Sequence, residues 1–508
     1  MTSALSIFRT STAPAASSPA PTHRTPTQGQ AAIDVVRRIL PDFRREQTSL
    51  QRIDDYVRGE QDEPFKPDEQ DGPETRALLK RSIANVLPLV VGGIAQTLKM
   101  TGYRRSDQAE NAKAWATWQA NGWDARQDAL HRASLTYGVA YSVVLPGDTA
   151  AVMRPVSPRR MLAVYADQAA DEWPLYALEE ATERGPDGAA RSRLKLYTDG
   201  VIHYLSAESG TDELDYIETR EHRLGVCPVV RFPCELDLEG RYTGEVEPLI
   251  SYQDRVNQAT FDTAMVQSFG AFVIRTLTGS TLPGMPGTPE GGETGDRQVA
   301  RRAKLQIGAD RILSAQDPEA RFGSLPATPL DGHLSSRDQT LRDLALRAQM
   351  PPHAFLGTGT NVNAEALAAT EAGLQRKGAN HRLTFGESHE QDLRLAALAE
   401  GDLEGWEDRE AASVWGDTEA RSLAQTADAI VKLAGPEVQV DPDLLLPMLP
   451  GWTQRDLDQA REYRERMRAE AVVDSLSAEL SRQSGTTPTS STGGVPGNDP
   501  SSRTPAGE

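Results

Sequence analysis

The sequence predicts an α+β fold, in which some stretches of the chain are helical and others are rich in strands. Between residues 335 and 400 apolar side chains recur every three, four or seven positions, which is the spacing of one face of an amphipathic helix. Between residues 139 and 221 they alternate or form short runs separated by Gly, Pro and Asp, which indicates antiparallel strands joined as a meander. Two helical stretches also flank a glycine- and proline-rich segment, residues 271–330, which has strand-like runs near its ends.

Composition excludes several classes of protein. The chain of 508 residues can form several domains, and its net charge of −19 argues against a general nucleic-acid-binding surface. Cys227 and Cys234 are its two cysteines, which excludes a disulfide scaffold. A C-x6-C pair without neighbouring histidines is a poor zinc site, so we expect two buried or half-buried thiols. No apolar run approaches the ~18 residues that a membrane span requires.

Both ends of the sequence have the composition of disordered tails. Residues 1–33 contain no acidic residue and much Ser, Thr, Ala and Pro, and residues 483–508 are of low complexity. The N-terminal composition would also suit a transit peptide, but no amphipathic helix can be drawn through its prolines. No secretory signal is expected either, because ALSIF is too short for an apolar core.

Four helices are expected before the strands, at residues 34–58, 74–99, 111–121 and 123–137. Pro41 and Pro88 lie inside the first two, and we expect a bend at each because proline removes a backbone hydrogen bond. Trp115, Trp118 and Trp123 form a cluster that is more typical of a packed core or an interface than of a cofactor site.

One helix precedes the glycine-rich segment and another follows it. The first covers residues 243–270 and has one clear apolar face, whereas Asp254 and Asn257, as polar residues of a helix, would ordinarily face solvent. The second covers residues 330–350 and ends before two consecutive prolines, Pro351 and Pro352.

Two pairs of opposite charge in the second helix have the spacing of ion pairs. Asp338 with Arg342 and Asp343 with Arg347 are four residues apart, and each pair would contribute about 0.2–0.5 kcal/mol. Ordinary surface pairs of a soluble helix would look the same.

A second, longer helix begins near Asn363 and has no internal proline, so it could reach roughly 55 Å. We expect Asn363 to cap it, and Glu365 to favour the positive end of its dipole. Gly373, Gly378 and Gly386 each cost about 1 kcal/mol relative to alanine, and we expect a kink there.

Two of these segments resemble a known family. The run NVNAEALAATEAGLQRK, which opens the long helix, is similar to the tunnel-helix segment of portal proteins from tailed double-stranded DNA phages of the siphovirus type. Asn363 stands where that family usually has serine. The run GEVE at Gly244, followed by QDRVN from Gln253 to Asn257, resembles the start of that family's first stem helix.

The resemblance implies a portal fold with a wing, a stem, a clip and a crown, and with a β-rich wing and clip. The expected parts are a disordered tail (1–33), a wing of helices and antiparallel sheet (34–242), the first stem helix (243–270), the clip (271–329), the second stem helix (330–350), a tunnel loop (351–362), a long kinked tunnel helix (363–402), the crown (403–482) and a disordered tail (483–508).

The resemblance also implies a structural role. Portal proteins form a ring, typically a dodecamer, at one capsid vertex of the virion, and double-stranded DNA passes through the ring during packaging and ejection. The expected partners are further copies of the chain, double-stranded DNA, the terminase large subunit, the major capsid or scaffold protein and a head-to-tail adaptor. Assembly would take place in the host cytoplasm, with no membrane involved.

The residues implied for this role lie in the loop and in the stem helices. The tunnel loop would present Phe355, Leu356, Gly357, Thr358, Gly359, Thr360 and Asn361 to the DNA channel. The stem helices would contribute Glu245, Gln253, Asp254, Asn257, Asp338, Arg342, Asp343 and Arg347.

The sequence contains no recognisable catalytic motif. The histidines are scattered, and His381 and His389 lie about two helical turns apart, too far along the axis to share one metal ion. There is no H-E-x-x-H, no G-x-S-x-G and no phosphate-binding loop. We therefore expect no enzymatic activity, no cofactor and no metal site.

Two other classes of protein stay open. A non-enzymatic helical scaffold or adaptor would explain the long helices, although not the β-rich region between two of them. An acidic hydrolase with an unrecognised carboxylate site would depend on a substrate or a cation.

Overall fold

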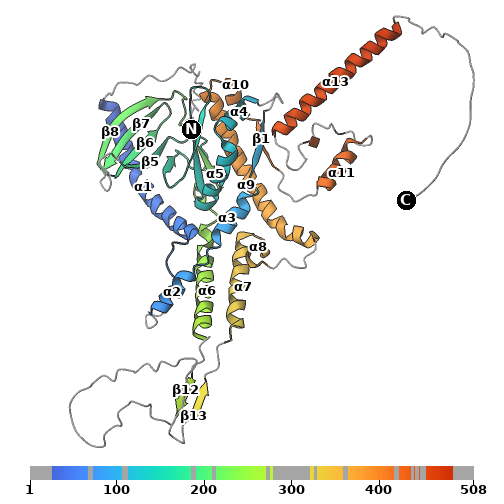
Figure 1. Ribbon diagram of the computed structural model, residues 1–508. Helices are drawn as coiled ribbons and strands as arrows, with labels where there is room; N and C mark the ends of the chain where they lie inside the picture. Colours follow the sequence, from blue (N-terminus) through green and yellow to red (C-terminus); the bar gives the residue numbers. More distant parts are fainter. Residues whose placement is uncertain are drawn as a thin grey trace, which may run out of the picture. The chain divides into compact units, whose positions relative to one another are not determined.

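The computed structural model of the protein describes residues 26–66, 72–105, 112–184, 190–208, 213–270, 275–278, 321–324, 329–357, 364–416, 423–435, 440, 445–446 and 454–483. The chain divides into two compact units, Met1–Trp415 and Gly416–Glu508. Helices and antiparallel sheets both occur in the first unit, which confirms the predicted α+β class (Figure 1).

The first helix, α1 (Pro26–Arg58), begins earlier than predicted. The N-terminal tail was expected to be disordered to residue 33, and this was wrong for residues 26–33. Pro26 suits the first position of a helix because its missing N–H would have no partner there. Ala32 is already buried against the sheet, and Pro41 lies inside the helix as expected.

The predicted helix 74–99 consists of two shorter ones, α2 (Pro73–Arg81) and α3 (Leu87–Ala95). Pro88 lies in the first turn of α3, where a proline begins a helix and does not bend one. The next two predicted helices are confirmed as α4 (Ala112–Ala120) and α5 (Trp123–Tyr137). Trp118 and Trp123 are fully buried, in agreement with a role in the core.

Two antiparallel sheets follow α5, and the five-stranded one confirms the predicted meander. The five-stranded sheet has its strands in sequence order: β4 (Met161–Val164), β5 (Tyr176–Arg184), β6 (Ala190–Tyr197), β7 (Val201–Glu208) and β8 (Leu214–Glu221). The three-stranded sheet has the order β3 (Val152–Val156), β2 (Val139–Leu145) and β9 (Val229–Pro233). Val36 and Phe43 of α1 pack against apolar residues of the larger sheet. A short hairpin, β10 (Glu235–Leu236) and β11 (Tyr242–Thr243), leads out of the sheets.

The two helices that flank the glycine-rich segment lie side by side (Figure 1). They are α6 (Ile250–Gly270), which follows the short helix η2 (Glu247–Leu249), and α7 (Asp331–Ala348). Between them in sequence, β12 (Arg275–Thr278) pairs with β13 (Arg321–Ser324). The other residues of the predicted clip lie outside the described ranges.

The predicted long helix is α9 (Ala364–Ala399), a helix of 36 residues. It packs on β2 and β9 of the smaller sheet and on α3. The segment before it was expected to be a plain turn, but it contains one helical turn, α8 (His353–Leu356), which Gly357 ends in the left-handed conformation.

The predicted crown begins too early. Residues 403–415 belong to the first unit and form α10 (Leu403–Glu407) and β14 (Ala412–Trp415). β14 pairs with β1 (Met100–Arg104), a strand more than 300 residues away in sequence, and a pairing at that distance leaves no local signal. The second unit contains α11 (Leu423–Ala434) and α13 (Gln454–Gln483).

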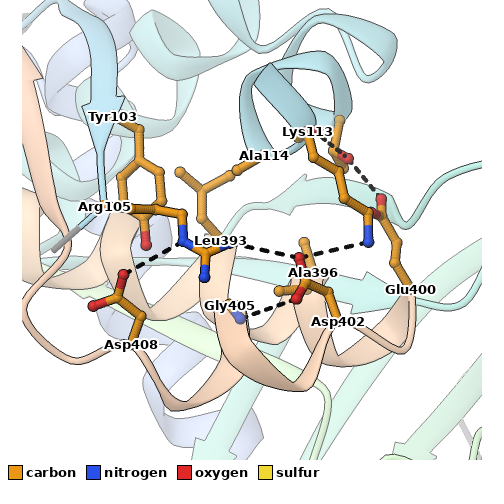
Figure 2. Close-up of a pocket in the computed structure, with 12 residues that line it drawn as sticks. Tyr103, Arg105, Lys113, Ala114, Leu393, Ala396, Glu400, Asp402, Gly405 and Asp408 are labelled. Atoms are coloured by element: carbon orange, nitrogen blue, oxygen red, sulfur yellow. Dashed lines mark hydrogen bonds and ion pairs between the residues drawn. The ribbon is translucent and has the colours of Figure 1, made fainter. Parts of the chain in front are cut away.

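A pocket lies where α9 ends, between that helix, β1 and α4 (Figure 2). Its lining includes Arg105, Lys113, Glu400 and Asp402.

Within the described ranges, none of the helices combines the length and the apolar content of a membrane span.

Candidate functional site

Two polar side chains of α6 are buried and hold the segment between α2 and α3. Gln253 is 0% exposed and Asn257 is 2% exposed. Gln253 accepts a hydrogen bond from the Val86 amide at 3.0 Å and donates one to the Ala84 carbonyl at 2.8 Å. Asn257 accepts from the Ala84 amide at 3.0 Å and from the Gln253 side chain at 2.8 Å. These side chains therefore satisfy backbone groups that have no helical partner, and the expectation that Asn257 faces solvent was wrong.

Charged residues of the two helices pair differently from the prediction. Asp338 lies 3.2 Å from its neighbour Arg337, and Asp343 lies 3.6 Å from Arg255 of α6. Among the described residues of α7, neither intrahelical pair, with Arg342 or with Arg347, is formed. Packing α6 beside α7 brings a cation to Asp343 from outside its own helix, which the spacing within α7 could not indicate.

Asp254 also reaches another helix. It is exposed and accepts a hydrogen bond from the Tyr56 hydroxyl of α1 at 2.8 Å.

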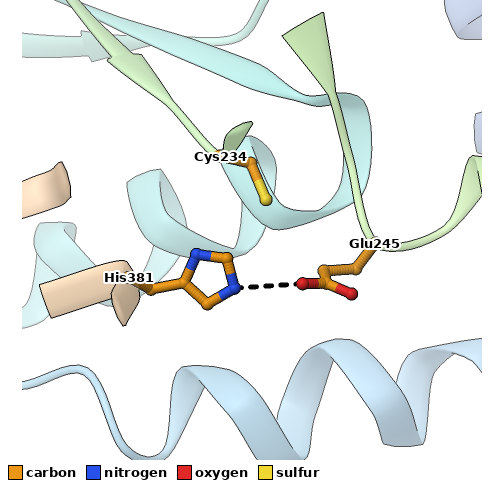
Figure 3. A group of neighbouring side chains, drawn as sticks. All are labelled: Cys234, Glu245 and His381. Carbon is orange, nitrogen blue, oxygen red and sulfur yellow. Dashed lines mark hydrogen bonds and ion pairs between the residues drawn. The ribbon is translucent and has the colours of Figure 1, made fainter. Parts of the chain in front are cut away.

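Glu245, just before η2, connects this region to α9 (Figure 3). Its carboxylate accepts a hydrogen bond from His381 at 3.0 Å and forms an ion pair with Lys377. Lys377 also donates to the Ala348 carbonyl, at the end of α7, at 3.1 Å. Burial pushes the pKa of Glu245 upward, but His381 and Lys377 together hold that pKa below its ordinary value. Glu245 is thus an ionised carboxylate inside the protein.

Cys234 completes a group of possible metal ligands with Glu245 and His381, whose ligand atoms lie within 4.8 Å of one another. Thiolate, imidazole and carboxylate are a donor set that zinc accepts. However, the Lys377 ammonium group already supplies the positive charge against the Glu245 carboxylate. Burial also raises the pKa of the Cys234 thiol well above its ordinary value. The cluster is therefore better described as a buried ion pair than as a metal centre. Cys227, like Cys234, is a free buried thiol, as predicted.

The buried face of α9 continues with further polar groups. His389 lies 2.9 Å from His131 of α5, nitrogen to nitrogen, and Phe385 stacks on His131. Asp392 accepts a hydrogen bond from Ser142 of β2 at 3.1 Å. Burial lowers the pKa of His131 to about 4 and raises the pKa of Asp392 to about 8. Both groups are therefore uncharged near neutral pH. His381 and His389 have separate partners, in line with their spacing.

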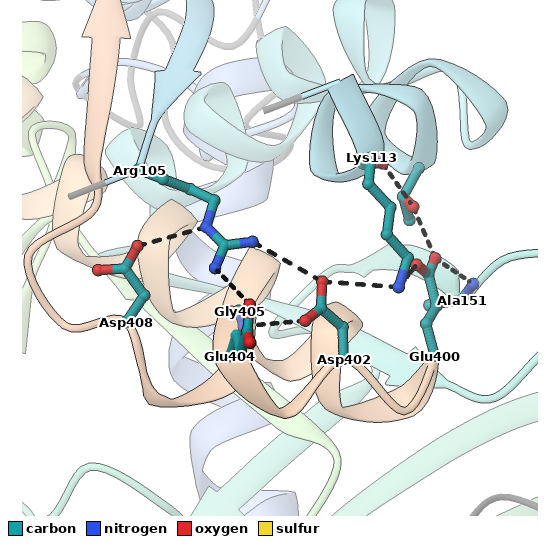
Figure 4. A network of polar contacts seen from close by, with 9 residues as sticks. Arg105, Lys113, Ala151, Glu400, Asp402, Glu404, Gly405 and Asp408 are labelled. Atoms are coloured by element: carbon teal, nitrogen blue, oxygen red, sulfur yellow. Dashed lines mark hydrogen bonds and ion pairs between the residues drawn. The ribbon is translucent and has the colours of Figure 1, made fainter. Parts of the chain in front are cut away.

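The end of α9 is held by a network of charges (Figure 4). Glu400 accepts hydrogen bonds from Thr117 of α4 at 2.6 Å and from the Ala151 amide at 2.9 Å. Lys113 lies 3.5 Å from Asp402. These charges face one another and not a free reaction space, so we interpret the pocket as a structural contact of α9, α10 and α4.

Part of the predicted tunnel loop can be placed. Phe355 and Leu356 are half-buried in α8 and pack against the main core, and Gly357 is exposed with φ +64°. Thr358, Gly359, Thr360, Asn361 and Asn363 lie outside the described residues, as does the side chain of Glu365. α9 begins at Ala364, directly after the proposed cap. The capping role of Asn363 and the kink in the helix stay predictions.

Lys377 was missed by the sequence analysis. It lies one turn before His381, on the face of α9 for which the apolar spacing predicted burial. A lysine on a face that is otherwise expected to be buried could have indicated a buried ion pair. Its partners come from residues 245 and 348, which no local pattern connects to it.

Residues 37–471 match a protein family described as phage portal protein, SPP1 Gp6-like. The chain belongs to the phage portal protein family. This portal-family chain is 26% identical over 366 residues to the portal protein of Mycobacterium phage D29, which covers 68% of this chain and 71% of that protein. It is 24% identical over 401 residues to the portal protein of Mycobacterium phage L5, with 74% and 77% covered.

A solved structure of a native gene transfer agent virion contains a chain that is similar at a TM-score of 0.42. The identity is 12%, over 75% of this portal-family chain and 94% of the other. The resemblance noted in the sequence is confirmed by the family match, and the chain has the structural role of a phage portal protein.

Proposed function

We propose that twelve copies of this chain form a ring at one vertex of a phage capsid and that double-stranded DNA passes through its centre. Membership of the portal family supports this proposal. The observation that carries it furthest is the pair α6 and α7, two adjacent helices that flank an antiparallel pair of short strands in sequence. In the ring these helices would be the stem, and β12 and β13 would belong to the clip.

The net charge of −19 fits a passage better than a binding surface. Each Lys or Arg that neutralises a phosphate adds affinity through counterion release, so a basic wall would retain DNA. A neutral or mildly repulsive wall lets DNA slide. The pairs Arg255–Asp343 and Arg337–Asp338 reduce the charge of the stem helices locally.

The remaining partners follow from the same proposal. The clip would meet the terminase large subunit during packaging and a head-to-tail adaptor afterwards. The wing would contact the major capsid or scaffold protein, and the ring would assemble in the host cytoplasm. The packaging motor is then a separate protein, and this chain needs no catalytic site of its own.

The tunnel loop would touch DNA sterically, through Phe355, Leu356 and the residues Thr358 to Thr360. Gly357 has φ +64°, which alanine adopts only with strain. Replacing Gly357 and Gly359 by alanine should therefore impair DNA packaging and leave rings intact. The measurement is DNA filling of capsids that carry the variant, with ring formation checked by electron microscopy. Normal filling would contradict the assigned role of the loop.

Electron microscopy of the purified protein, with its native mass measured in parallel, tests the ring. We expect rings of twelve subunits with a central hole wide enough for duplex DNA. A monodisperse monomer or dimer, also in the presence of capsid and scaffold proteins, would favour a helical adaptor in a larger assembly.

A further inference from the structure

Lys377 of α9 lies where both stem helices meet that helix. Its ammonium group pairs with Glu245, which precedes η2 and α6. The same group donates to the carbonyl of Ala348, the last residue of α7, at 3.1 Å. His381, one turn further along α9, binds the second carboxylate oxygen of Glu245 at 3.0 Å. One short stretch of α9 therefore touches the segment that leads into one stem helix and the end of the other.

These groups are buried, so their pairing matters more than it would at the surface. The side chains of Lys377, Glu245 and His381 are 12%, 10% and 5% exposed. A buried charge that loses its partner destabilises a protein strongly. The carbonyl end of α7 also carries the negative end of a helix dipole, which favours a cation there. The ammonium group is thus stabilised by two separate elements at once.

The arrangement fits a single axial position of α9. A slip of one helical turn would displace the ammonium group by about 5.4 Å, well beyond hydrogen-bonding distance. The residues one turn before Lys377 are Gly373 and Leu374, and neither can supply a positive charge. A slip that brings these residues to the junction would therefore lose both contacts.

We propose that Lys377, Glu245 and His381 form a junction that couples α9 to both stem helices, so that α9 cannot shift without depriving both of a buried partner. Lys377 is a positioning residue in this junction. The inference concerns contacts within one copy of the chain, and it stands independently of the proposed DNA channel.

Hydrogen exchange of the full-length Lys377→Met variant tests the junction. Exchange should accelerate about tenfold or more in three separate segments: the first turns of α6, the last turn of α7 and the middle of α9. The matched control is Arg154→Met, which removes a cation from another buried carboxylate, Glu179. In that variant exchange should rise around β3 and β5 and stay unchanged in both stem helices.

A faster exchange in α9 alone, or an equal rise throughout the chain, would overturn the proposal. A double-mutant cycle in thermal unfolding that uses the polar substitution Lys377→Gln keeps the test valid if the methionine variant folds poorly. Glu245→Gln keeps the size of the side chain and an acceptor, and its loss in melting temperature should not add to that of Lys377→Gln. Fully additive losses would show that the two residues act independently.

Discussion

Asp392 is a carboxyl group of α9 in a fully buried position. It is 0% exposed and accepts one hydrogen bond, from Ser142, while its other oxygen has no hydrogen-bond partner among the described residues. Burial therefore raises its pKa to about 8. An unfolded chain titrates an aspartate near about 3.9, so between these values the folded state retains a proton that the unfolded state has lost. The stability associated with this proton is present below about pH 3.9 and is lost as the pH rises to about 8.

His131 changes the stability of the folded state with pH in the opposite direction to Asp392. Burial lowers its pKa to about 4, whereas an unfolded histidine titrates near about 6.5. The contribution of the neutral His131 imidazole to the stability of the folded state is present above about pH 6.5 and is lost as the pH falls toward 4. The pKa of His389 is also lowered by burial. These three groups together predict the greatest stability near about pH 6.5.

The variant Asp392→Asn should become more stable than the natural chain as the pH rises. Asparagine has nearly the same shape and can retain the hydrogen bond with Ser142. At pH 7.5 we expect a gain on the order of 2–4 kcal/mol, and at pH 4.5 a small difference. The measurement is the urea midpoint from pH 4 to 9, with the exposed Asp262→Asn as a control for charge removal. A gain that does not change with pH would mean that Asp392 is not the titrating group.

Gln253 and Asn257 allow a test of how α6 is attached to the segment between α2 and α3. Replacing either by alanine leaves a backbone amide, of Val86 or Ala84, without its partner. We expect a loss of about 1–3 kcal/mol for each and a less than additive loss for both, because the two side chains bond to each other. Gln258→Ala, one turn from Asp254 on the same helix, should change the unfolding free energy by less than about 0.5 kcal/mol. Urea unfolding followed by tryptophan fluorescence distinguishes these outcomes.

At the scale of elements, two glycines of α9 are explained by close packing. A Cβ atom on Gly378 would lie 2.3 Å from the hydroxyl oxygen of Thr97 and 3.0 Å from its Cβ. A Cβ atom on Gly386 would lie 2.8 Å from the hydroxyl oxygen of Ser413. These glycines thus let α9 approach the turn after α3 and the strand β14. Gly373 differs, because its nearest neighbour would be a carbonyl oxygen at 3.7 Å, an ordinary contact.

Because Gly378 is closely packed and Gly373 is not, replacing each by alanine should change the stability of the protein in opposite directions. Gly378→Ala should destabilise the protein by about 1–3 kcal/mol, because α9 would have to move away from Thr97. Gly373→Ala should stabilise it by up to about 1 kcal/mol through helix propensity. Thermal unfolding measures both, and Thr97→Ala should restore part of the loss in the Gly378→Ala background. Equal effects of the two alanines would mean that propensity alone governs these positions.

Elements with a regular local pattern could be predicted from the sequence. The apolar spacing of α6, α7 and α9 repeats at every turn, and the alternation in β4 to β8 repeats at every second residue. The break between α2 and α3 was missed because Pro88 is compatible with both a bend and a helix start. The partners of buried polar groups were missed because they come from distant elements: His131 and His389 are 258 residues apart in sequence. A pattern in the sequence marks which face of a helix is buried, but not what the opposite element presents.

At the scale of the molecule, the first unit is closed by its last strand. β14 covers β1, and Trp415 lies 5.8 Å from the ring of His131 and 6.0 Å from the ring of His389, centroid to centroid. Asp408, directly after α10, places its carboxylate 3.6 Å from Arg105. The residues after 402 therefore complete the core around the buried histidine pair, although the sequence placed them in another domain.

Two truncated chains distinguish a domain boundary at residue 402, as the sequence predicted, from one after residue 415, as the structure has it. A chain of residues 1–416 retains β14 and should unfold cooperatively, with a core as stable as that of the full-length protein. A chain of residues 1–402 loses the partner of β1 and the side chain of Trp415, so the His131–His389 pair becomes accessible to water. We expect a melting temperature lower by at least several degrees above pH 6.5. Water lets both imidazoles take up protons without the cost of burial, so protonation of this pair no longer destabilises the shorter chain, and the difference between the two chains should shrink below pH 6.5. Circular dichroism melts of the two chains between pH 5 and 8 measure the difference. Equal melts would place the boundary at residue 402 and remove β14 from the core.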